Sequence, residues 1–136
     1  MTAARPELCV GAVVVDDERL LMVRRGHGPA AGTWSIPGGR VESGETMAEA
    51  VVRELREETG LDGLCGGLVG WIERTEDDHH HVILDFRVDL LSDAVPSAGD
   101  DAAEAAWVPL SDVADRRLAP GLAAFLADHG IIDTLV

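Results

Sequence analysis

Three glutamates, Glu54, Glu57 and Glu58, have the spacing of side chains that share one side of a helix. At 3.6 residues per turn they fall within an arc of roughly 100°. Like charges at these spacings destabilise a helix, so a compensating charge is expected, and a hard divalent cation with oxygen ligands is the natural candidate. Arg53 could neutralise part of the charge and reach back to Glu45. On the glutamates alone, a solvated acidic helix face stays open as the alternative.

The helix that carries these glutamates has recognisable start and stop signals. Thr46 is a plausible N-cap with Glu49 three residues later, the spacing of a capping box. Gly60 supplies the glycine that commonly follows the last helical turn. Before the helix, residues 37–39 (Pro-Gly-Gly) are predicted to form a tight loop. A broad apolar face lies beside the acidic one and is expected to pack into a core. Its members are Met47, Ala48, Val51, Val52 and Leu55.

The stretch from Gly39 to Leu61 resembles the Nudix box, G-x5-E-x7-R-E-U-x-E-E-x-G-U, in which U is a bulky aliphatic residue. This chain fills every fixed position of that pattern. The matching residues are Gly39, Glu45, Arg53, Glu54, Leu55, Glu57, Glu58, Gly60 and Leu61. Residues 34–38 (Trp-Ser-Ile-Pro-Gly) precede the box, as such residues commonly do in the Nudix hydrolase family. The chain thus resembles the small, single-domain members of that family that are MutT-like or ADP-ribose pyrophosphatase-like.

The resemblance implies an α/β fold, the Nudix α/β/α sandwich with a central mixed β-sheet. It implies a single Nudix domain over residues 1–136, with the box at 39–61. The expected reaction is hydrolysis of a nucleoside diphosphate linked to another group X, with Mg²⁺ or Mn²⁺ as cofactor. A nucleoside triphosphate, an oxidised nucleotide and ADP-ribose are the substrate candidates. A catalytically silent nucleotide sensor with the same fold is the alternative, although such a domain would be expected to lose box glutamates.

Roles follow from the matched positions. Glu54, Glu57 and Glu58 would be metal ligands, and the backbone carbonyl of Gly38 a further one. Glu54 and Glu57 would also be catalytic, with Glu54 favoured as the general base among the box residues. Because cation-assisted transfer at phosphorus depends on charge neutralisation and positioning, these acidic residues suit the chemistry.

Three box residues, Gly39, Glu45 and Arg53, would support the loop and the helix. Outside the box, an acidic residue on a later loop is the other candidate for the general base. Asp100, Asp101 and Glu104 precede Trp107 in the expected region, and Glu104 is the leading candidate, with an ordinary charged strand residue as its alternative.

Substrate contacts are predicted from residues outside the box. Arg24 and Arg25 could contact a phosphate, although solvated charges at a strand end are the more common meaning. Trp34 or Trp71 could contribute to base binding, although a large aromatic residue at position 34 is more often core. Residues 79–81 (His-His-His) do not suit one metal ion, because consecutive residues in a strand point to opposite faces.

The remaining elements are predicted from periodicity. In the strand at 80–91, the pattern places Asp85, Arg87 and Asp89 outward or towards a substrate cleft, opposite an apolar face. A short helical turn is expected near Ser111 and a last helix after Pro120. The expected strands cover residues 8–15, 20–23, 33–36, 64–74, 80–91 and 104–108.

Composition narrows the partners. Lys and Arg number 11 against 25 Asp and Glu, a net charge of −14, which disfavours a long nucleic acid or an anionic membrane as a partner and leaves a small nucleotide substrate.

Cys9 and Cys65 are expected as free, buried thiols. Met1 to Glu7 does not resemble a signal peptide, and no stretch has the length of a membrane span, so a cytoplasmic protein is expected. A homodimer is left open.

Overall fold

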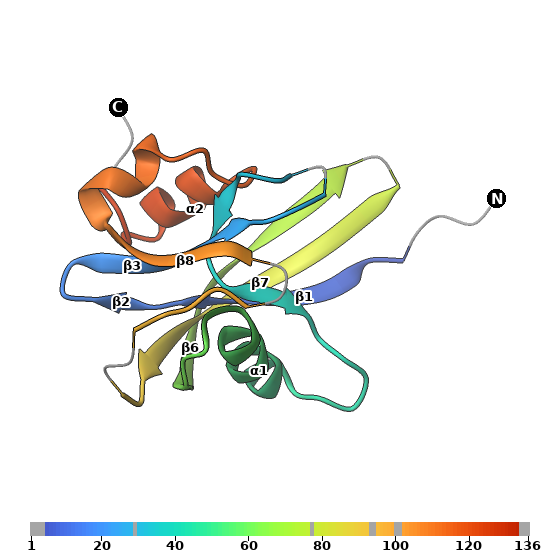
Figure 1. Ribbon diagram of the computed structural model, residues 1–136. Helices are drawn as coiled ribbons and strands as arrows, with labels where there is room; N and C mark the ends of the chain where they lie inside the picture. Colours follow the sequence, from blue (N-terminus) through green and yellow to red (C-terminus); the bar gives the residue numbers. More distant parts are fainter. Residues whose placement is uncertain (1–4, 29, 77, 93–94, 100–101, 134–136) are drawn as a thin grey trace.

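The computed structural model describes residues 5–28, 30–76, 78–92, 95–99 and 102–133. Within these ranges, eight strands form two four-stranded sheets (Figure 1). The first sheet has the order β5-β1-β7-β6, with β1 parallel to β7 and the other neighbours antiparallel. In the second sheet, β3 pairs with β2, β4 and β8. The strands are β1 (Glu7–Val13), β2 (Val15–Asp16), β3 (Arg19–Arg25), β4 (Trp34–Ser35), β5 (Gly38–Arg40), β6 (Gly63–Glu76), β7 (His79–Leu90) and β8 (Ala102–Pro109).

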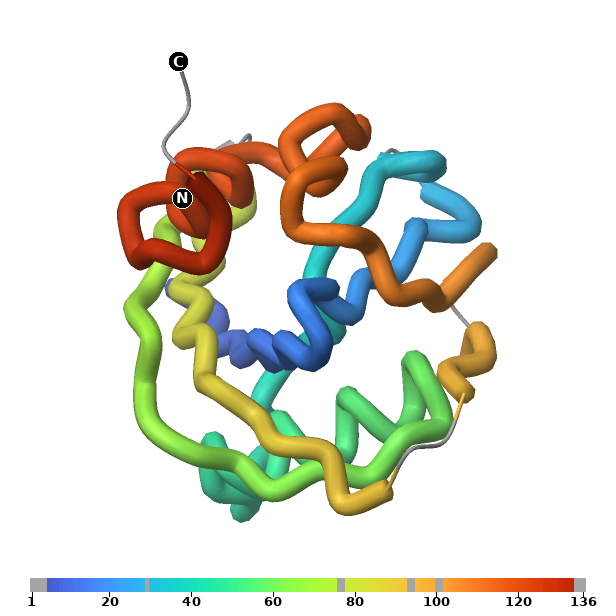
Figure 2. The backbone as a smooth tube through the Cα atoms, turned by 90° about the vertical axis from the view of Figure 1, so that its left-hand side faces the viewer, coloured from blue at the N-terminus to red at the C-terminus, as the bar shows by residue number. Residues whose placement is uncertain are grey.

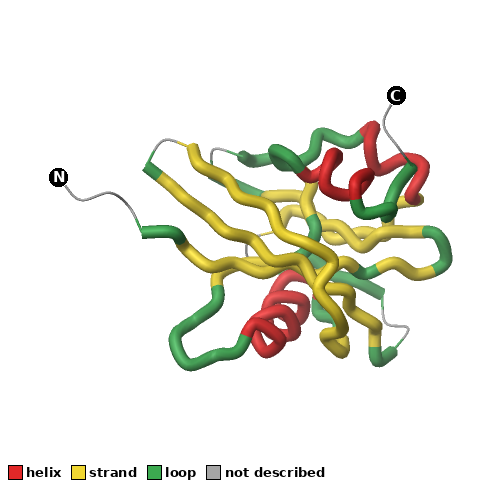
Figure 3. Tube along the Cα trace, turned by 180° about the vertical axis from the view of Figure 1, so that it is seen from behind, coloured by secondary structure: helices red, strands yellow, loops and turns green. Residues whose placement is uncertain are grey.

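Two helices cover opposite sides of these sheets. Helix α1 (Met47–Thr59) lies on one side, and α2 (Leu122–Asp128) lies on the other with the short 3₁₀ helix η1 (Leu110–Asp115), as Figure 3 shows from behind. The α/β sandwich with a mixed sheet, predicted from the sequence, is therefore confirmed.

Strand β1 runs through the middle of the molecule, between α1 and α2 in the view of Figure 2. Its side chains alternate between two hydrophobic clusters, as the period of a strand requires. Val10 and Ala12 pack with Leu55 of α1, while Val13 packs with Leu122 and other residues of α2. Burial on both faces explains why the first strand is almost continuously apolar.

Helix α1 begins and ends where the sequence predicts. The Glu49 N–H donates to the Thr46 hydroxyl at 3.1 Å, and the Thr46 N–H donates to the Glu49 carboxylate at 2.9 Å, so the capping box is complete. Gly60 adopts φ 73°, and its N–H donates to the Arg56 carbonyl at 2.9 Å. The left-handed backbone conformation at this position favours glycine, because glycine has no Cβ that would clash with the backbone. These local signals determine where the helix begins and ends, and therefore where the acidic face lies along the chain.

Two details near the first strands differ from the prediction. Residues 38–40 do not form only a loop, because they pair antiparallel with β1 as the short strand β5. The predicted first strand over 8–15 is divided into β1 and β2, and the turn after it contains Asp17 and Glu18, both with positive φ. The pairing of β5 with a distant strand is a tertiary contact, which local Pro and Gly signals do not report.

The prediction for Asp85 was wrong in one respect. Arg87 and Asp89 are exposed, as expected, but Asp85 has only 1% of its surface exposed. The burial is local to this position, because the paired residue Gly11 leaves the space that the Asp85 carboxyl group fills. Alternation correctly places Asp85 on the same face as Arg87 and Asp89, but it cannot say which positions on that face are covered by other segments.

The cysteines are both free. Cys9 is buried as predicted, whereas Cys65 is only half-buried, a correction to its expected burial. In the described part of the chain, no helix is long and apolar enough to cross a membrane.

Candidate active site

The box glutamates lie where α1 packs against β5. The Gly38 N–H donates to Oε1 of Glu58 at 3.2 Å, which ties the loop to the last turn of the helix. Gly39 lies directly against Glu54, since a Cβ on Gly39 would be 2.5 Å from the carboxyl carbon of Glu54. A larger residue at position 39 would displace the Glu54 carboxyl group, whereas at position 38 a Cβ would meet the backbone of Val10 in β1.

Arg53 holds the acidic residues together. Its Nε and Nη2 donate to the two oxygens of Glu45 at 2.8 and 2.9 Å, a bidentate pair. Its Nη1 donates to Glu54 at 2.8 Å and to Glu57 at 3.2 Å. Its Nη2 also donates to the carbonyl of Arg40 at 2.9 Å. The predicted contact between Arg53 and Glu45 is confirmed, and one guanidinium fixes α1 against the loop that precedes it.

The carboxylates differ in their surroundings. Burial raises the pKa of Glu58 to about 8, and the charge of Glu54 adds to this, while the Gly38 N–H and the charge of Arg25 oppose it. Burial also raises the pKa of Glu54, against the lowering effect of Arg53. Hydrogen bonds from Arg53 lower the pKa of Glu45 to about 2, so that carboxylate is firmly ionised. Glu54 and Glu58 therefore form a partly buried carboxyl pair, in which burial and the charge of Glu54 favour the protonated form of Glu58.

The donor set of this region fits a hard divalent cation. It consists of carboxylate oxygens and a backbone carbonyl, which are the ligands that Mg²⁺ prefers. Within the described ranges, no three His, Cys, Asp or Glu side chains already converge as a metal cluster. Protein donors engage the carboxylates instead, with Arg53 on Glu54 and Glu57 and the Gly38 N–H on Glu58. Each donor takes one oxygen of its carboxylate, so the other oxygen of each is left for a cation.

Three predicted charged residues outside the box, Arg24, Arg25 and Glu104, lie on two neighbouring strands. Arg24 of β3 and Glu104 of β8 are paired, with Nε and Oε1 3.4 Å apart. Arg25 is exposed, and its charge acts on Glu58 across the site. Asp100 and Asp101, the other candidates for an extra-box base, lie outside the described residues.

Trp34 lies in the hydrophobic core on the α2 side, with 9% of its surface exposed. The Arg116 guanidinium lies over its ring at 5.4 Å. This position favours the core interpretation of Trp34, and stacking on a base stays a prediction. Trp71, by contrast, has 64% of its surface exposed.

One set of contacts at the site was not predicted. Residues 95–99 approach the end of α1, and the Gly99 N–H donates to the carbonyl of Glu58 at 3.1 Å. The contact joins residues 41 positions apart in the sequence. The sequence shows only an Ala-, Asp- and Gly-rich stretch there, and this composition carries no signal for a partner.

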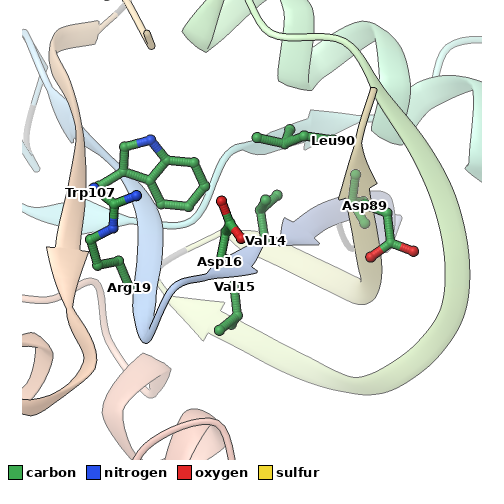
Figure 4. Close-up of a pocket in the computed structure, with 8 residues that line it drawn as sticks. Val14, Val15, Asp16, Arg19, Asp89, Leu90 and Trp107 are labelled. Carbon is green, nitrogen blue, oxygen red and sulfur yellow. The ribbon is translucent and has the colours of Figure 1, made fainter. Parts of the chain in front are cut away.

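A cleft of about 430 Å³ lies elsewhere in the molecule and contains no box residue (Figure 4). Trp107 forms one wall, with the Arg19 guanidinium 5.1 Å from its ring centre. The other lining residues are Val14, Val15, Asp16, Val88, Asp89 and Leu90. This mixture of aliphatic and oppositely charged groups lacks the clustered carboxylates of the region around α1.

A family model described as the NUDIX domain matches residues 5–129. The chain belongs to the NUDIX family. It is 38% identical over 110 residues to a protein of Methanocaldococcus jannaschii named ADP-ribose pyrophosphatase, a match that covers 79% of this chain and 64% of that protein. The chain therefore spans less than two thirds of the length of that relative.

A second relative is named a putative 8-oxo-dGTP diphosphatase, from Bacillus subtilis. It is 32% identical over 116 residues, covering 79% of this chain and 74% of that protein. Among solved structures, a MutT NUDIX hydrolase from Burkholderia pseudomallei superposes with a TM-score of 0.81 at 26% identity, covering 90% of this chain and 97% of the other. The predicted family, MutT-like Nudix hydrolases, is thus confirmed for this chain.

Proposed function

We propose that this NUDIX protein is a pyrophosphohydrolase that cleaves a nucleoside diphosphate linked to another group X with the help of Mg²⁺ or Mn²⁺. The observation that carries the proposal is the packing of the box as one unit. Glu54 and Glu58 lie against Gly39 and Gly38, and Arg53 bonds Glu45, Glu54 and Glu57. The names of two relatives, a pyrophosphatase and a putative diphosphatase, support the reaction class.

In this proposal Glu54, Glu57 and Glu58 hold the cation, with the Gly38 carbonyl as a further ligand. A bound divalent cation would neutralise charge on the pyrophosphate and favour ionisation of the attacking water. Of the three proposed ligand carboxylates, Glu57 is well exposed, with 57% of its side chain accessible, and an incoming ion could reach it directly.

Three residues have a supporting role in this proposal, because they position the cation ligands without binding the cation. They are Arg53, Glu45 and Gly39. The bidentate pair between Arg53 and Glu45 fixes the guanidinium, which in turn orients Glu54. Because Gly39 leaves room for the Glu54 carboxyl group, the loop and helix can approach each other. Such supporting contacts affect activity nearly as strongly as the ligands do.

The general base would be Glu54 or Glu104. Glu54 is half-buried beside the other carboxylates, and burial raises its pKa, which makes its carboxylate a stronger base than an exposed one. Glu104 is exposed and paired with Arg24. Arg24 and Arg25 would meet the substrate phosphates, and Trp34 would contact the base. We also propose that residues 1–136 form one NUDIX domain.

The experiment is a hydrolysis assay on a panel of nucleoside diphosphate derivatives, with and without Mg²⁺. The panel contains ADP-ribose, canonical and 8-oxo nucleoside triphosphates, dinucleoside polyphosphates, NADH and nucleotide sugars, and a coupled phosphatase or pyrophosphatase reveals the products. The proposal predicts turnover of at least one member only when the metal is present. Tight nucleotide binding without turnover of any member would contradict it and favour a nucleotide sensor.

A further inference from the structure

Residues 95–99 supply hydrogen bonds to the end of α1. The Ser97 N–H donates to the carbonyl of Thr59 at 2.9 Å, and the Gly99 N–H donates to the carbonyl of Glu58 at 3.1 Å. The last carbonyls of a helix have no partner within the helix, so they need one from outside. Figure 1 shows this segment passing beside α1. A distant part of the chain thus completes the turn that carries Glu57 and Glu58.

Gly99 approaches the helix backbone so closely that no larger residue fits there. A Cβ on Gly99 would overlap the carbonyl oxygen of Glu57, and it would lie 2.9 Å from the carbonyl carbon of Glu57 and 3.2 Å from Cα of Glu58. These are backbone atoms and cannot turn away as the end of a side chain can. Gly99 is absent from the glycines with positive φ, so the requirement for glycine comes from space and not from backbone conformation.

The same residue is also linked to β8. The Ala102 N–H donates to the Gly99 carbonyl at 3.3 Å, at the first residue of β8. Glu104 follows two residues later and pairs with Arg24. Gly99 is therefore bonded through its N–H to the helix of Glu57 and Glu58, and through its carbonyl to the strand of Glu104. One peptide stretch connects the two acidic parts of the site.

We infer that Gly99 is a positioning residue for the reaction, which sets the end of α1 and the start of β8 at the separation that the acidic residues require. The inference rests on the proposed function. It assigns no contact with the substrate to Gly99. A methyl group at this position would push the segment from the helix and move Glu104 relative to Glu57 and Glu58.

The test compares Gly99→Ala with Gly67→Ala as a matched control. Gly67 lies in β6, and a Cβ there would meet no atom within 4 Å, so the same chemical change has no steric consequence. For the wild type and both variants, kcat, KM and the Mn²⁺ concentration for half-maximal activity are measured on the best substrate of the panel. The affinity for Mn²⁺ in the absence of substrate is measured by titration calorimetry, and the unfolding temperature of each protein is measured as a check on folding.

For Gly99→Ala we expect kcat to fall about 100-fold, the size of effect that a misplacement of about 1 Å can have. We expect KM to stay within about 3-fold, because positioning acts on the reacting state more than on substrate binding. Mn²⁺ binding should weaken, and Gly67→Ala should match the wild type in every measurement.

A Gly99→Ala variant with wild-type kcat and Mn²⁺ affinity would overturn the inference, and so would equal losses in Gly67→Ala. If Gly99→Ala does not fold, Ser97→Pro replaces it, since proline removes the N–H that donates to Thr59 and adds no atom at Glu57. Loss of kcat in folded Ser97→Pro supports the inference, and full activity overturns it. A wild-type protein without turnover of any substrate overturns the proposed function and the role of Gly99 together.

Discussion

Replacing Asp85 with asparagine should change how the stability of the protein depends on pH. Asp85 is 1% exposed in the middle of the first sheet, and its Oδ1 has no hydrogen-bond partner among the described residues. Burial raises the pKa of Asp85 from 3.8 to about 7, and the charge of Arg74 opposes the rise only in part. Asparagine has nearly the same shape and cannot ionise, so Asp85→Asn removes the titration and keeps the packing.

The free energy of unfolding should decrease as pH rises, because the folded protein and the unfolded chain bind the proton of Asp85 with different affinity. Between pH 4 and 7 the folded protein keeps the proton of Asp85 while the unfolded chain has lost it, so unfolding releases a proton and stability falls as pH rises. Below this window both states are protonated, and above it both are ionised. At about 1.4 kcal/mol per pH unit, the full effect is about 4 kcal/mol, of which roughly 2–3 kcal/mol falls between pH 5 and 8.

The assay is urea denaturation followed by tryptophan fluorescence at pH 5, 6, 7 and 8 and constant ionic strength. From pH 5 to 8, the wild type should lose roughly 2–3 kcal/mol more unfolding free energy than Asp85→Asn. Other titrating groups, Glu58 included, are present in both proteins and cancel in the comparison. Asp89→Asn, an exposed change on the same strand, is the control and should follow the wild type. Parallel curves for the wild type and Asp85→Asn would refute the reasoning.

Four further substitutions test the helix cap, Arg53 and the two tryptophans. Thr46→Ala removes the side chain that accepts from Glu49 and should lower the unfolding free energy by about 1 kcal/mol in urea denaturation, and an unchanged value would contradict the cap. Arg53→Lys cannot form the bidentate pair and should reduce kcat by about 10-fold or more in the hydrolysis assay, whereas full activity would remove its supporting role. Trp34→Ala should cost about 3–5 kcal/mol of stability because Trp34 is core, whereas exposed Trp71→Ala should not, and unchanged KM in both would exclude them from base binding.

Local signals predicted the helix of the box well. The capping residues Thr46 and Glu49, the terminal Gly60 and the contact of Arg53 with Glu45 are all found as the sequence indicates. Each depends on residues at most 8 positions apart, so the relevant partner is visible in the same stretch of sequence. The acidic face could be located for the same reason.

Contacts between distant parts of the chain could not be predicted in this way. The burial of Asp85 depends on Gly11 in a neighbouring strand, and the backbone contact of Gly99 depends on Glu57 in a helix. Both glycines matter through the space that they leave for another segment. The pairing of Glu104 with Arg24 likewise follows from the register of β8 against β3, which the strand pattern alone does not fix.

The central claim is that carboxylates on α1 hold a divalent cation and that this cation enables hydrolysis. The most direct test measures the hydrolysis rate as a function of Mg²⁺ concentration for the wild type and for Glu57→Gln. Glu73→Gln, a change in β6 at a side chain that contacts His80 of β7, serves as the control. The wild type and the control should be inactive in a chelator and gain activity with Mg²⁺, while Glu57→Gln should lose roughly 100-fold or more in kcat and keep its unfolding temperature. Activity without any divalent cation, or full activity of Glu57→Gln, would contradict the assignment.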